Sequence, residues 1–241
     1  MQADQNYRTW VTDGFKSVTI RNSRTSEVVM TFGFLIVILG ATHKLAPAGF
    51  AMLCVDLPGS GYCNHWRLQQ DSSRIHLAIL DYLPEIPWVD HGRVAMLGYR
   101  FAGNVAARLA FIAAERLRAI VTIGAPVDRL FTDVQRFQSL PQMYQDCLAN
   151  RSGVNSVNKE SLFYRCLPLS LKTQGLLGGA RTSTPMFVVG RKNDLISPEA
   201  DLSLLSSASR DCKVELLKEQ DSLENYDQIF TEVTHWLQKQ L

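Results

Sequence analysis

The pattern with the clearest chemical meaning lies at residues 93–110, where an apolar run leads into a glycine turn and an alanine-rich segment. Residues 98–102 read Gly-Tyr-Arg-Phe-Ala, which resembles the G-x-S-x-G pattern of a nucleophile elbow with arginine at the serine position. In such an elbow the middle residue projects from a strained strand-to-helix turn, where a serine hydroxyl attacks an acyl carbonyl. The guanidinium of Arg100 stays protonated and cannot attack. The pattern therefore predicts the geometry of an acyl-transfer site without its attacking atom.

Two roles are open for Arg100. A desolvated arginine at the head of a helix can bind a carboxylate or a phosphate in a fork geometry, with Tyr99 and Phe101 beside the ligand. This role predicts a small anionic ligand. Alternatively, Asp194 or Asp56 pairs with Arg100, and the arginine then fills a pocket that has no catalytic function. The residue types do not decide between the two roles.

Asp194 ends a late apolar run, at the position where the acid of a Ser-His-Asp triad commonly lies. It is therefore a candidate catalytic residue. Two other interpretations are a turn aspartate that caps the helix expected near Pro198, and a partner of Arg100 in a buried ion pair.

The base and the nucleophile of a triad have no clear candidates. Residues 219–227, which follow the last expected strand and are the place for a catalytic histidine, contain none. His235 is expected on the surface of the terminal helix, and His91 lies before the elbow strand, at the wrong end of the sheet. Ser60, in the turn Pro58–Gly61, follows a strand at the edge where parallel sheets bind ligands, so it is the best substitute nucleophile by position. The alternative is a purely structural glycine–serine turn.

Apolar β-rich runs alternate with helical patterns, which predicts βα units around a parallel sheet. With the elbow, this predicts an α/β-hydrolase fold: a mostly parallel central sheet, helices on both faces and a small helical cap at about residues 127–179. The first two strands are expected to be antiparallel to each other, and Phe34–Leu39 is expected to be a central strand. The expected strands are residues 15–21, 27–31, 34–39, 50–55, 93–97, 119–123, 186–189 and 213–217.

The composition of the 241-residue chain is that of an ordinary globular protein, with 46% hydrophobic and 20% charged residues. A formal net charge of +2 without basic blocks argues against nucleic acid and membrane surfaces as partners. The longest apolar run, residues 32–39, is far shorter than the roughly 20 residues of a membrane-spanning helix. The first residues do not match a secretory signal. Phosphate-loop and dinucleotide fingerprints are absent, so we expect no cofactor.

Five cysteines are scattered along the chain without C-x-x-C spacing: Cys54, Cys63, Cys147, Cys166 and Cys212. Their odd number and irregular spacing favour reduced thiols over disulfides or a zinc site. We therefore expect no metal and a cytoplasmic location.

Several segments resemble, in the same order, the fermentation–respiration switch protein (FrsA) family of bacterial α/β-hydrolase-like proteins. These segments are residues 70–73, 87–91, 93–106, 170–178, 192–194 and 229–237. The resemblance extends over roughly residues 34–241. An arginine at the elbow belongs to the pattern of this family.

The resemblance implies an α/β-hydrolase fold and carboxylesterase activity on short acyl esters. It implies, as an alternative, a non-catalytic regulatory protein that binds the unphosphorylated glucose-specific enzyme IIA of the sugar phosphotransferase system. Family members carry a longer N-terminal region, so residues 1–33 are expected to be its remnant and residues 34–241 the hydrolase-like domain. The stretch between Leu39 and Phe50 barely reaches the length of about 10–12 residues that a parallel crossover needs. We expect it to lack the loop that carries one oxyanion donor.

Overall fold

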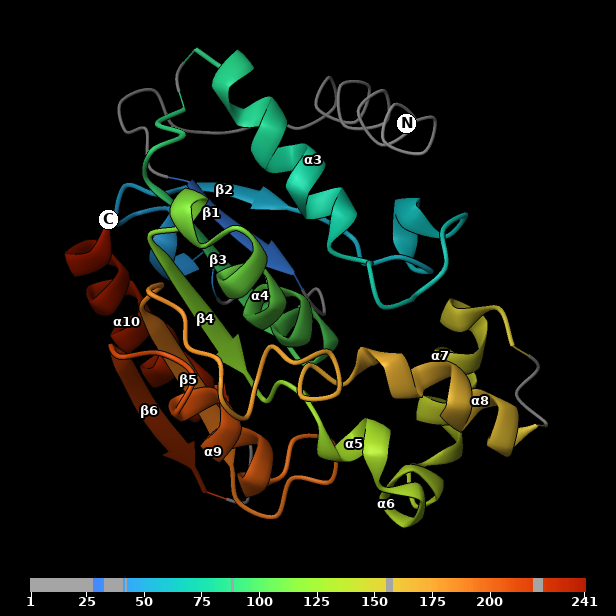
Figure 1. Ribbon diagram of the computed structural model, residues 1–241. Helices are drawn as coiled ribbons and strands as arrows, with labels where there is room; N and C mark the ends of the chain where they lie inside the picture. Colours follow the sequence, from blue (N-terminus) through green and yellow to red (C-terminus); the bar gives the residue numbers. More distant parts are fainter. Residues whose placement is uncertain (1–27, 33–40, 42, 88, 155–157, 219–222) are drawn as a thin grey trace.

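The computed structural model describes residues 28–32, 41, 43–87, 89–154, 158–218 and 223–241. These residues form a six-stranded sheet in the order β2-β1-β3-β4-β5-β6, and every neighbouring pair of strands is parallel (Figure 1). The strands are β1 (Val28–Phe32), β2 (Ala51–Cys54), β3 (Val94–Tyr99), β4 (Ala119–Ile123), β5 (Met186–Arg191) and β6 (Cys212–Leu217). The predicted parallel sheet is confirmed.

The first strand differs from its prediction. A strand is expected at 27–31, antiparallel to one at 15–21. β1 occupies this stretch, but it lies between β2 and β3 and is parallel to both. The prediction was wrong because the sequence Val-Val-Met-Thr-Phe lacks the polar–apolar alternation of a one-sided strand and suits an interior parallel strand. The strands expected at 15–21 and 34–39 lie outside the described residues. The boundary between an N-terminal remnant (residues 1–33) and the hydrolase-like domain (residues 34–241) stays a prediction. β1 lies before this boundary and belongs to the sheet.

Helices cover both faces of the sheet. They are α3 (Arg74–Tyr82), α4 (Phe101–Ile112), α9 (Glu199–Ser206) and α10 (Leu223–Gln240). One hydrophobic cluster joins one face of the sheet to α3, α4 and α9, and a second cluster joins the other face to α10 (Figure 1). Met96 and Leu97, which are adjacent in β3, belong to opposite clusters, because side chains alternate across a strand. Helices on both faces confirm the predicted α/β-hydrolase architecture.

The chain between β4 and β5 forms the short helices that the sequence predicts. They are α5 (Arg129–Thr132), α6 (Val134–Gln138), α7 (Gln142–Ser152) and α8 (Lys159–Cys166). Short 3-10 turns occur at Gly61–Cys63, Leu83–Glu85, Ala114–Arg116 and Leu167–Leu169. Helices α5 to α8 share a third hydrophobic cluster and lie at the end of the sheet to which the strands point (Figure 1). Phe101, the first residue of α4, packs against Phe131 of this segment with ring centroids 6.0 Å apart.

A buried carboxylate fixes the start of this helical segment. Asp201, on α9, is fully buried and accepts hydrogen bonds from the backbone N–H groups of Val127 (2.8 Å), Asp128 (3.1 Å) and Arg129 (3.0 Å). Burial raises the pKa of Asp201, and these three N–H groups counteract part of that effect. The contacts hold the beginning of the segment against α9.

Two general findings bear on function. Within the described ranges, no helix combines the length and the apolar content that a membrane crossing requires. The same part of the chain contains no group of three or more histidine, cysteine, aspartate or glutamate side chains that could hold a metal ion.

Candidate functional site

The backbone at residue 100 has the conformation of a nucleophile elbow. β3 ends at Tyr99, α4 begins at Phe101, and Arg100 between them has a φ of 55° and a ψ of −122°. A positive φ is strained for a residue with a side chain and persists only where surrounding contacts impose it. Here the N–H of Arg100 donates to Ile123 O (2.9 Å), and the N–H of Gly103 donates to Arg100 O (2.8 Å). The predicted strand–turn–helix arrangement is confirmed.

Two glycines allow α4 to pack closely behind the elbow. A Cβ atom at Gly98 would lie 2.3 Å from the carbonyl oxygen of Ala102. A Cβ atom at Gly103 would lie 2.5 Å from the Cβ of Ala125. Both distances are shorter than van der Waals contact. The atom that a Cβ at Gly98 would meet belongs to the backbone, which cannot rotate away as a side chain can. The elbow therefore depends on the absence of side chains at both positions.

We expect Gly98→Ala to lower the free energy of unfolding by about 2–3 kcal/mol, because the added methyl group forces β3 and α4 apart. Urea unfolding followed by circular dichroism measures the change. Gly179→Ala is the matched control, since a Cβ at that exposed position would meet no atom within 4 Å. Equal effects of the two substitutions would contradict the close packing at Gly98.

The side chain of Arg100 forms an ion pair with Asp194. Arg100 Nη1 donates to Asp194 Oδ2, and the two side chains are 14% and 2% exposed. Asp194 Oδ1 also accepts the N–H groups of Ile196 (2.8 Å) and Ser197 (3.2 Å), just before α9 begins. Arg191 Nε lies 3.9 Å from Asp194 Oδ2. The predicted pairing with Arg100 is thus observed, and Asp194 also binds the turn that precedes α9, but it does not cap this helix, whose N-cap residue is Pro198.

The surroundings of Arg100 favour its charged form. Burial alone lowers the pKa of Arg100, but the Asp194 carboxylate and the Tyr99 hydroxyl outweigh burial and raise that pKa above its ordinary value. The guanidinium carbon lies 5.4 Å from the centre of the Tyr99 ring, within the range of a cation–π contact. Arg100 Nε is buried and has no hydrogen-bond partner among the described residues. The elbow residue therefore carries a permanent positive charge and has one buried N–H group, at Nε, without an acceptor among the described residues.

Gly124, at the end of β4, makes room for this guanidinium. A Cβ atom at Gly124 would lie 2.7 Å from Arg100 Nη1, and the φ of Gly124 is +58°. The sequence analysis does not include Gly124 among its site residues. The signal available was the Gly-Ala-Pro sequence directly after the strand that neighbours the elbow strand.

Arg100 and Asp194 line a small cavity at the ends of the strands. The space inside it is about 10 Å³, enough for about one water molecule and far below the usual range of small-molecule pockets. Tyr99, Arg191 and Tyr226 line it as well, and the hydroxyls of Tyr99 and Tyr226 are 3.3 Å apart. Tyr226 belongs to α10, close to the place where a triad would carry its histidine, and sequence reasoning did not select it. No histidine and no serine is among the described residues that line the cavity.

The structure does not bring the other predicted residues to this cavity. Ser60 Oγ donates to Leu57 O (2.7 Å) and does not line the cavity. Phe101, predicted as a ligand-binding residue, lines a different cavity, because its side chain follows the face of α4 toward the helical segment. His235 and His91 are exposed, as expected. The predicted loss of the oxyanion loop concerns the stretch between Leu39 and Phe50. Its described residues, 41 and 43–49, form a short helical segment and a turn before β2, and the loss of the loop stays a prediction.

Asp56, the other candidate partner of Arg100, follows β2. A Cβ atom at Gly61 would lie 2.0 Å from Asp56 Oδ2, so this carboxylate is packed against the turn that follows β2. Asp56 forms no ion pair with Arg100 in the described structure, where the partner of Arg100 is Asp194.

Comparisons with solved structures agree with this fold. AbyA5 matches with a TM-score of 0.70 and 25% identity, over 91% of this chain and 68% of that chain. The 2,6-dihydroxy-pseudo-oxynicotine hydrolase matches with a TM-score of 0.72 and 17% identity, over 92% of this chain and 62% of the other. At the lower identity the similarity establishes the fold alone.

Sequence comparisons establish the family. The model described as "Esterase FrsA-like" matches residues 39–241. The curated relative "Esterase FrsA" from Escherichia coli O1:K1 / APEC is 43% identical over 196 residues, which are 81% of this chain and 47% of the relative. The chain thus spans about half the length of the curated relatives it matches. This chain belongs to the FrsA-like esterase family.

Proposed function

We propose that this chain hydrolyses short acyl esters at the elbow and that Arg100 binds the acyl oxygen there instead of attacking the carbonyl carbon. The match to the FrsA-like esterase family supports an esterase-type function. The buried pair of Arg100 with Asp194 at the elbow is the observation that supports the role of Arg100. Because the matched relatives are about twice as long, their activity enters here as a proposal.

Arg100 has the properties of an oxyanion-binding group. Its Nη1 is fixed by Asp194, while its Nε has no partner among the described residues. A fixed N–H donor gains strength as negative charge develops on the carbonyl oxygen in the transition state. The N-terminus of α4 adds a positive partial charge at the same place. The N–H of Phe101 occupies the position after the elbow residue, which supplies an oxyanion donor in α/β-hydrolases.

Water is the nucleophile in this proposal, since the described residues that line the cavity include no serine. Water attacks the acyl carbon, the bond to the leaving oxygen breaks, and the products are a carboxylic acid and an alcohol. One water proton goes to the leaving oxygen, and the acid loses its proton to solvent. Asp194 positions Arg100 and is not the base, because its oxygens already accept hydrogen bonds from Ile196, Ser197 and Arg100. The reaction is therefore expected to be slow, and small anions are expected to compete for Arg100.

Hydrolysis of phenyl acetate by the purified chain tests the proposal. We expect Arg100→Met to lower the rate above background by roughly 10²-fold, as loss of one oxyanion donor does in other enzymes. Ser60→Ala is the control and should keep the rate of the unmodified protein. An unchanged rate in Arg100→Met, or a rate lost in Ser60→Ala, would contradict this role of Arg100.

The same ion pair favours a second candidate function, because it occupies the elbow where a nucleophile would stand. In that case the chain is a non-catalytic protein that binds the unphosphorylated glucose-specific enzyme IIA of the sugar phosphotransferase system, as the family resemblance implies. Calorimetry with the unphosphorylated and phosphorylated enzyme IIA tests this candidate, and binding of the unphosphorylated form alone is the expected result. Equal binding of both forms, or none, would exclude it. Both candidates assume the cytoplasmic location that the cysteine spacing predicts.

A further inference from the structure

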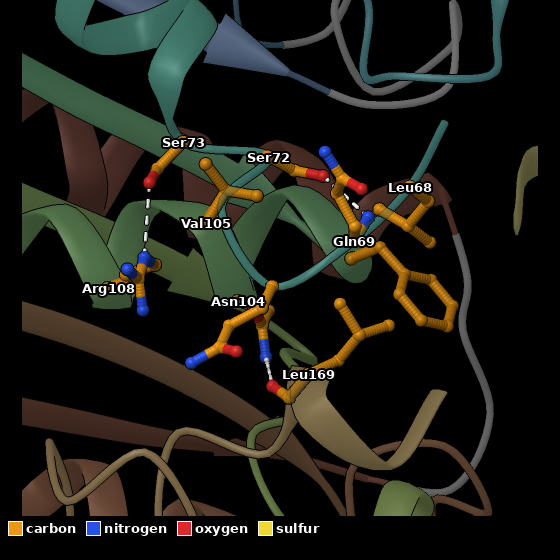
Figure 2. A pocket seen from close by; sticks show the side chains of 10 residues that line it. Leu68, Gln69, Ser72, Ser73, Asn104, Val105, Arg108 and Leu169 are labelled. Carbon is orange, nitrogen blue, oxygen red and sulfur yellow. Dashed lines mark hydrogen bonds between the residues drawn. The ribbon is translucent and has the colours of Figure 1, made fainter. Parts of the chain in front are cut away.

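The cavity between α4 and the chain that leads into α3 has no room for a ligand (Figure 2). The space inside it is about 10 Å³, enough for about one water molecule. Its polar side chains also bind within the chain, since Arg108 Nε donates to Ser73 Oγ (3.1 Å) and Asn104 Nδ2 donates to Leu169 O (3.0 Å). The surface of the molecule is more open, at one edge of the sheet.

This edge is formed by β6 (Cys212–Leu217), the last strand of the six-stranded sheet (Figure 1). The six residues of β6 pair with β5 in one unbroken register without a bulge, and the strand contains no proline. The opposite edge strand, β2, has four residues. Short edge strands, prolines and bulges are common devices that prevent an edge from pairing with another chain. β6 has neither a bulge nor a proline and is the longer of the two edges.

The backbone of β6 presents hydrogen-bonding groups beyond this edge. Leu217 O accepts the N–H of Lys192 (3.1 Å), which leads out of β5. The N–H and C=O groups of one residue point to the same side of a strand, and the side alternates from residue to residue, so the odd-numbered residues of β6 bind β5. The even-numbered residues therefore point their N–H and C=O groups away from the sheet, and no strand of the described structure pairs with them. These residues are Cys212, Val214 and Leu216.

The side chains of β6 divide between the two faces of the sheet. Val214 lies beside Val188, whose hydrophobic cluster includes α9, and Lys213 lies beside Phe187, whose cluster includes α10. On the α9 side, Val214 and Leu216 are 41% and 42% exposed. These two side chains form an apolar strip next to the open backbone.

Lys213 does not obstruct the edge, although lysine often protects edge strands. Its Nζ lies 4.4 Å from the centre of the Phe187 ring and donates to Glu232 Oε2 of α10 (2.9 Å). Glu215 Oε1 lies 3.5 Å from the same Nζ. Both charges therefore lie on the α10 face of the sheet and leave the backbone of the edge open.

The charges of β6 are complementary to those of a second β6 strand. Two identical edges related by a two-fold axis pair antiparallel, and the outward groups bond when even-numbered residues face one another. With Val214 opposite Val214 of the second copy, each Lys213 lies opposite a Glu215. Moving the axis by one residue places Lys213 opposite Lys213, or Glu215 opposite Glu215. Opposite charges on facing residues stabilise a strand pair and like charges destabilise it, so charge favours the register centred on Val214.

We propose that two copies of this chain form a dimer in which their β6 strands pair antiparallel, centred on Val214. The N–H and C=O groups of Val214 bond across the axis, and Cys212 of each copy faces Leu216 of the other. Residues that face each other in a sheet share a face. The apolar strips therefore meet between the two α9 helices, and the Lys213–Glu215 pairs lie between the two α10 helices. The proposal does not depend on esterase activity.

Sedimentation velocity of the full chain at several micromolar concentrations tests the proposal. We expect a reversible equilibrium of monomer and dimer. Val214→Pro removes the outward N–H at the axis and leaves the bonds to β5 intact, because proline is tolerated on an edge strand where its nitrogen faces away from the sheet. This variant should dimerise at least tenfold more weakly. Circular dichroism verifies the fold of each variant.

Exchange of charges tests the register. Glu215→Lys places lysine opposite Lys213 of the other copy, and Lys213→Glu places glutamate opposite Glu215, so each variant alone should dimerise at least tenfold more weakly. Mixed together, the two variants should form a heterodimer, because all facing charges are then opposite. Glu160→Lys makes the same change of charge at an exposed position of α8 and should dimerise as the unmodified protein does.

Several results would overturn the proposal. A chain that stays monomeric throughout does not use this edge for a second copy, and protection of the Val214 and Leu216 N–H groups from hydrogen exchange in that monomer would assign the edge to another segment. A dimer that Val214→Pro and the charge variants leave unchanged forms through another surface. A mixture of the two charge variants that yields no heterodimer contradicts the register centred on Val214.

Discussion

Replacing Asp194 with alanine is expected to lower the free energy of unfolding by about 3–5 kcal/mol, the usual cost of leaving one member of a buried ion pair without its partner. The substitution leaves the guanidinium of Arg100 buried without its counter-charge. It also removes the acceptor of the N–H groups of Ile196 and Ser197, two residues that are largely buried before α9. Urea unfolding followed by circular dichroism measures the loss.

The opposite substitution should cost less. In Arg100→Met the Asp194 carboxylate keeps the N–H groups of Ile196 and Ser197, and Arg191 remains 3.9 Å away. The methionine also fills part of the space of the arginine and relieves the desolvated charge. We therefore expect Asp194→Ala to be clearly less stable than Arg100→Met. A larger loss of unfolding free energy in Arg100→Met than in Asp194→Ala would contradict this description of the pair. In this description, the hydrogen bonds of Asp194 to the backbone contribute as much to stability as its pairing with Arg100 does.

His76 should make the stability of the protein depend on pH. His76 lies on α3 and is fully buried. Burial lowers its pKa to about 3, against a smaller opposing effect of a hydrogen bond with the Ser72 backbone. The unfolded chain, with an ordinary histidine pKa of about 6.5, binds a proton between pH 6.5 and pH 3 that the folded protein does not. Stability is therefore full above pH 6.5 and falls as the pH is lowered through this window.

The expected loss from His76 is about 2–3 kcal/mol between pH 7 and pH 4.5, at about 1.4 kcal/mol per pH unit below pH 6.5. Carboxylates contribute to the same curve, so the measurement compares variants. His76→Leu should show a smaller dependence of unfolding free energy on pH than the unmodified protein. His235→Leu, which changes an exposed histidine, should keep the full dependence. If unfolding free energy depended on pH equally in His76→Leu and in the unmodified protein, His76 would not take up a proton on unfolding.

Local sequence patterns were sufficient to predict most of the fold. The apolar run and the glycine turn at residues 93–103 predict the elbow because strand, turn and close helix packing each need particular neighbours in the sequence. The late strand at 186–189 was also placed correctly, inside β5. The strand expected at 27–31 coincides with β1, but its pairing was not predicted, because a short apolar run fixes neither the neighbours of a strand nor its direction.

The site was less predictable because its contacts join distant parts of the chain. Arg100 and Asp194 are 94 positions apart, and their pairing was one of several interpretations that rested on both residues ending parallel strands. Tyr226 had no signal of that kind, and the Gly-Ala-Pro sequence that begins at Gly124 is an unspecific one, since a glycine after a strand has many uses. Phe101 was expected beside a ligand of Arg100 but lines another cavity, because adjacency to Arg100 does not fix which way a side chain points on a helix.

The proposed function requires that the elbow acts through a paired arginine and that no serine becomes covalently modified. Phenyl acetate turnover in the presence of a fluorophosphonate, with the intact mass of the protein measured at intervals, distinguishes this mechanism from one with a seryl nucleophile. A water-attack site at Arg100 predicts that turnover continues and that the mass of the protein does not change. A fluorophosphonate adduct on a serine, Ser60 included, with parallel loss of turnover would contradict it and show that the chain uses a seryl nucleophile.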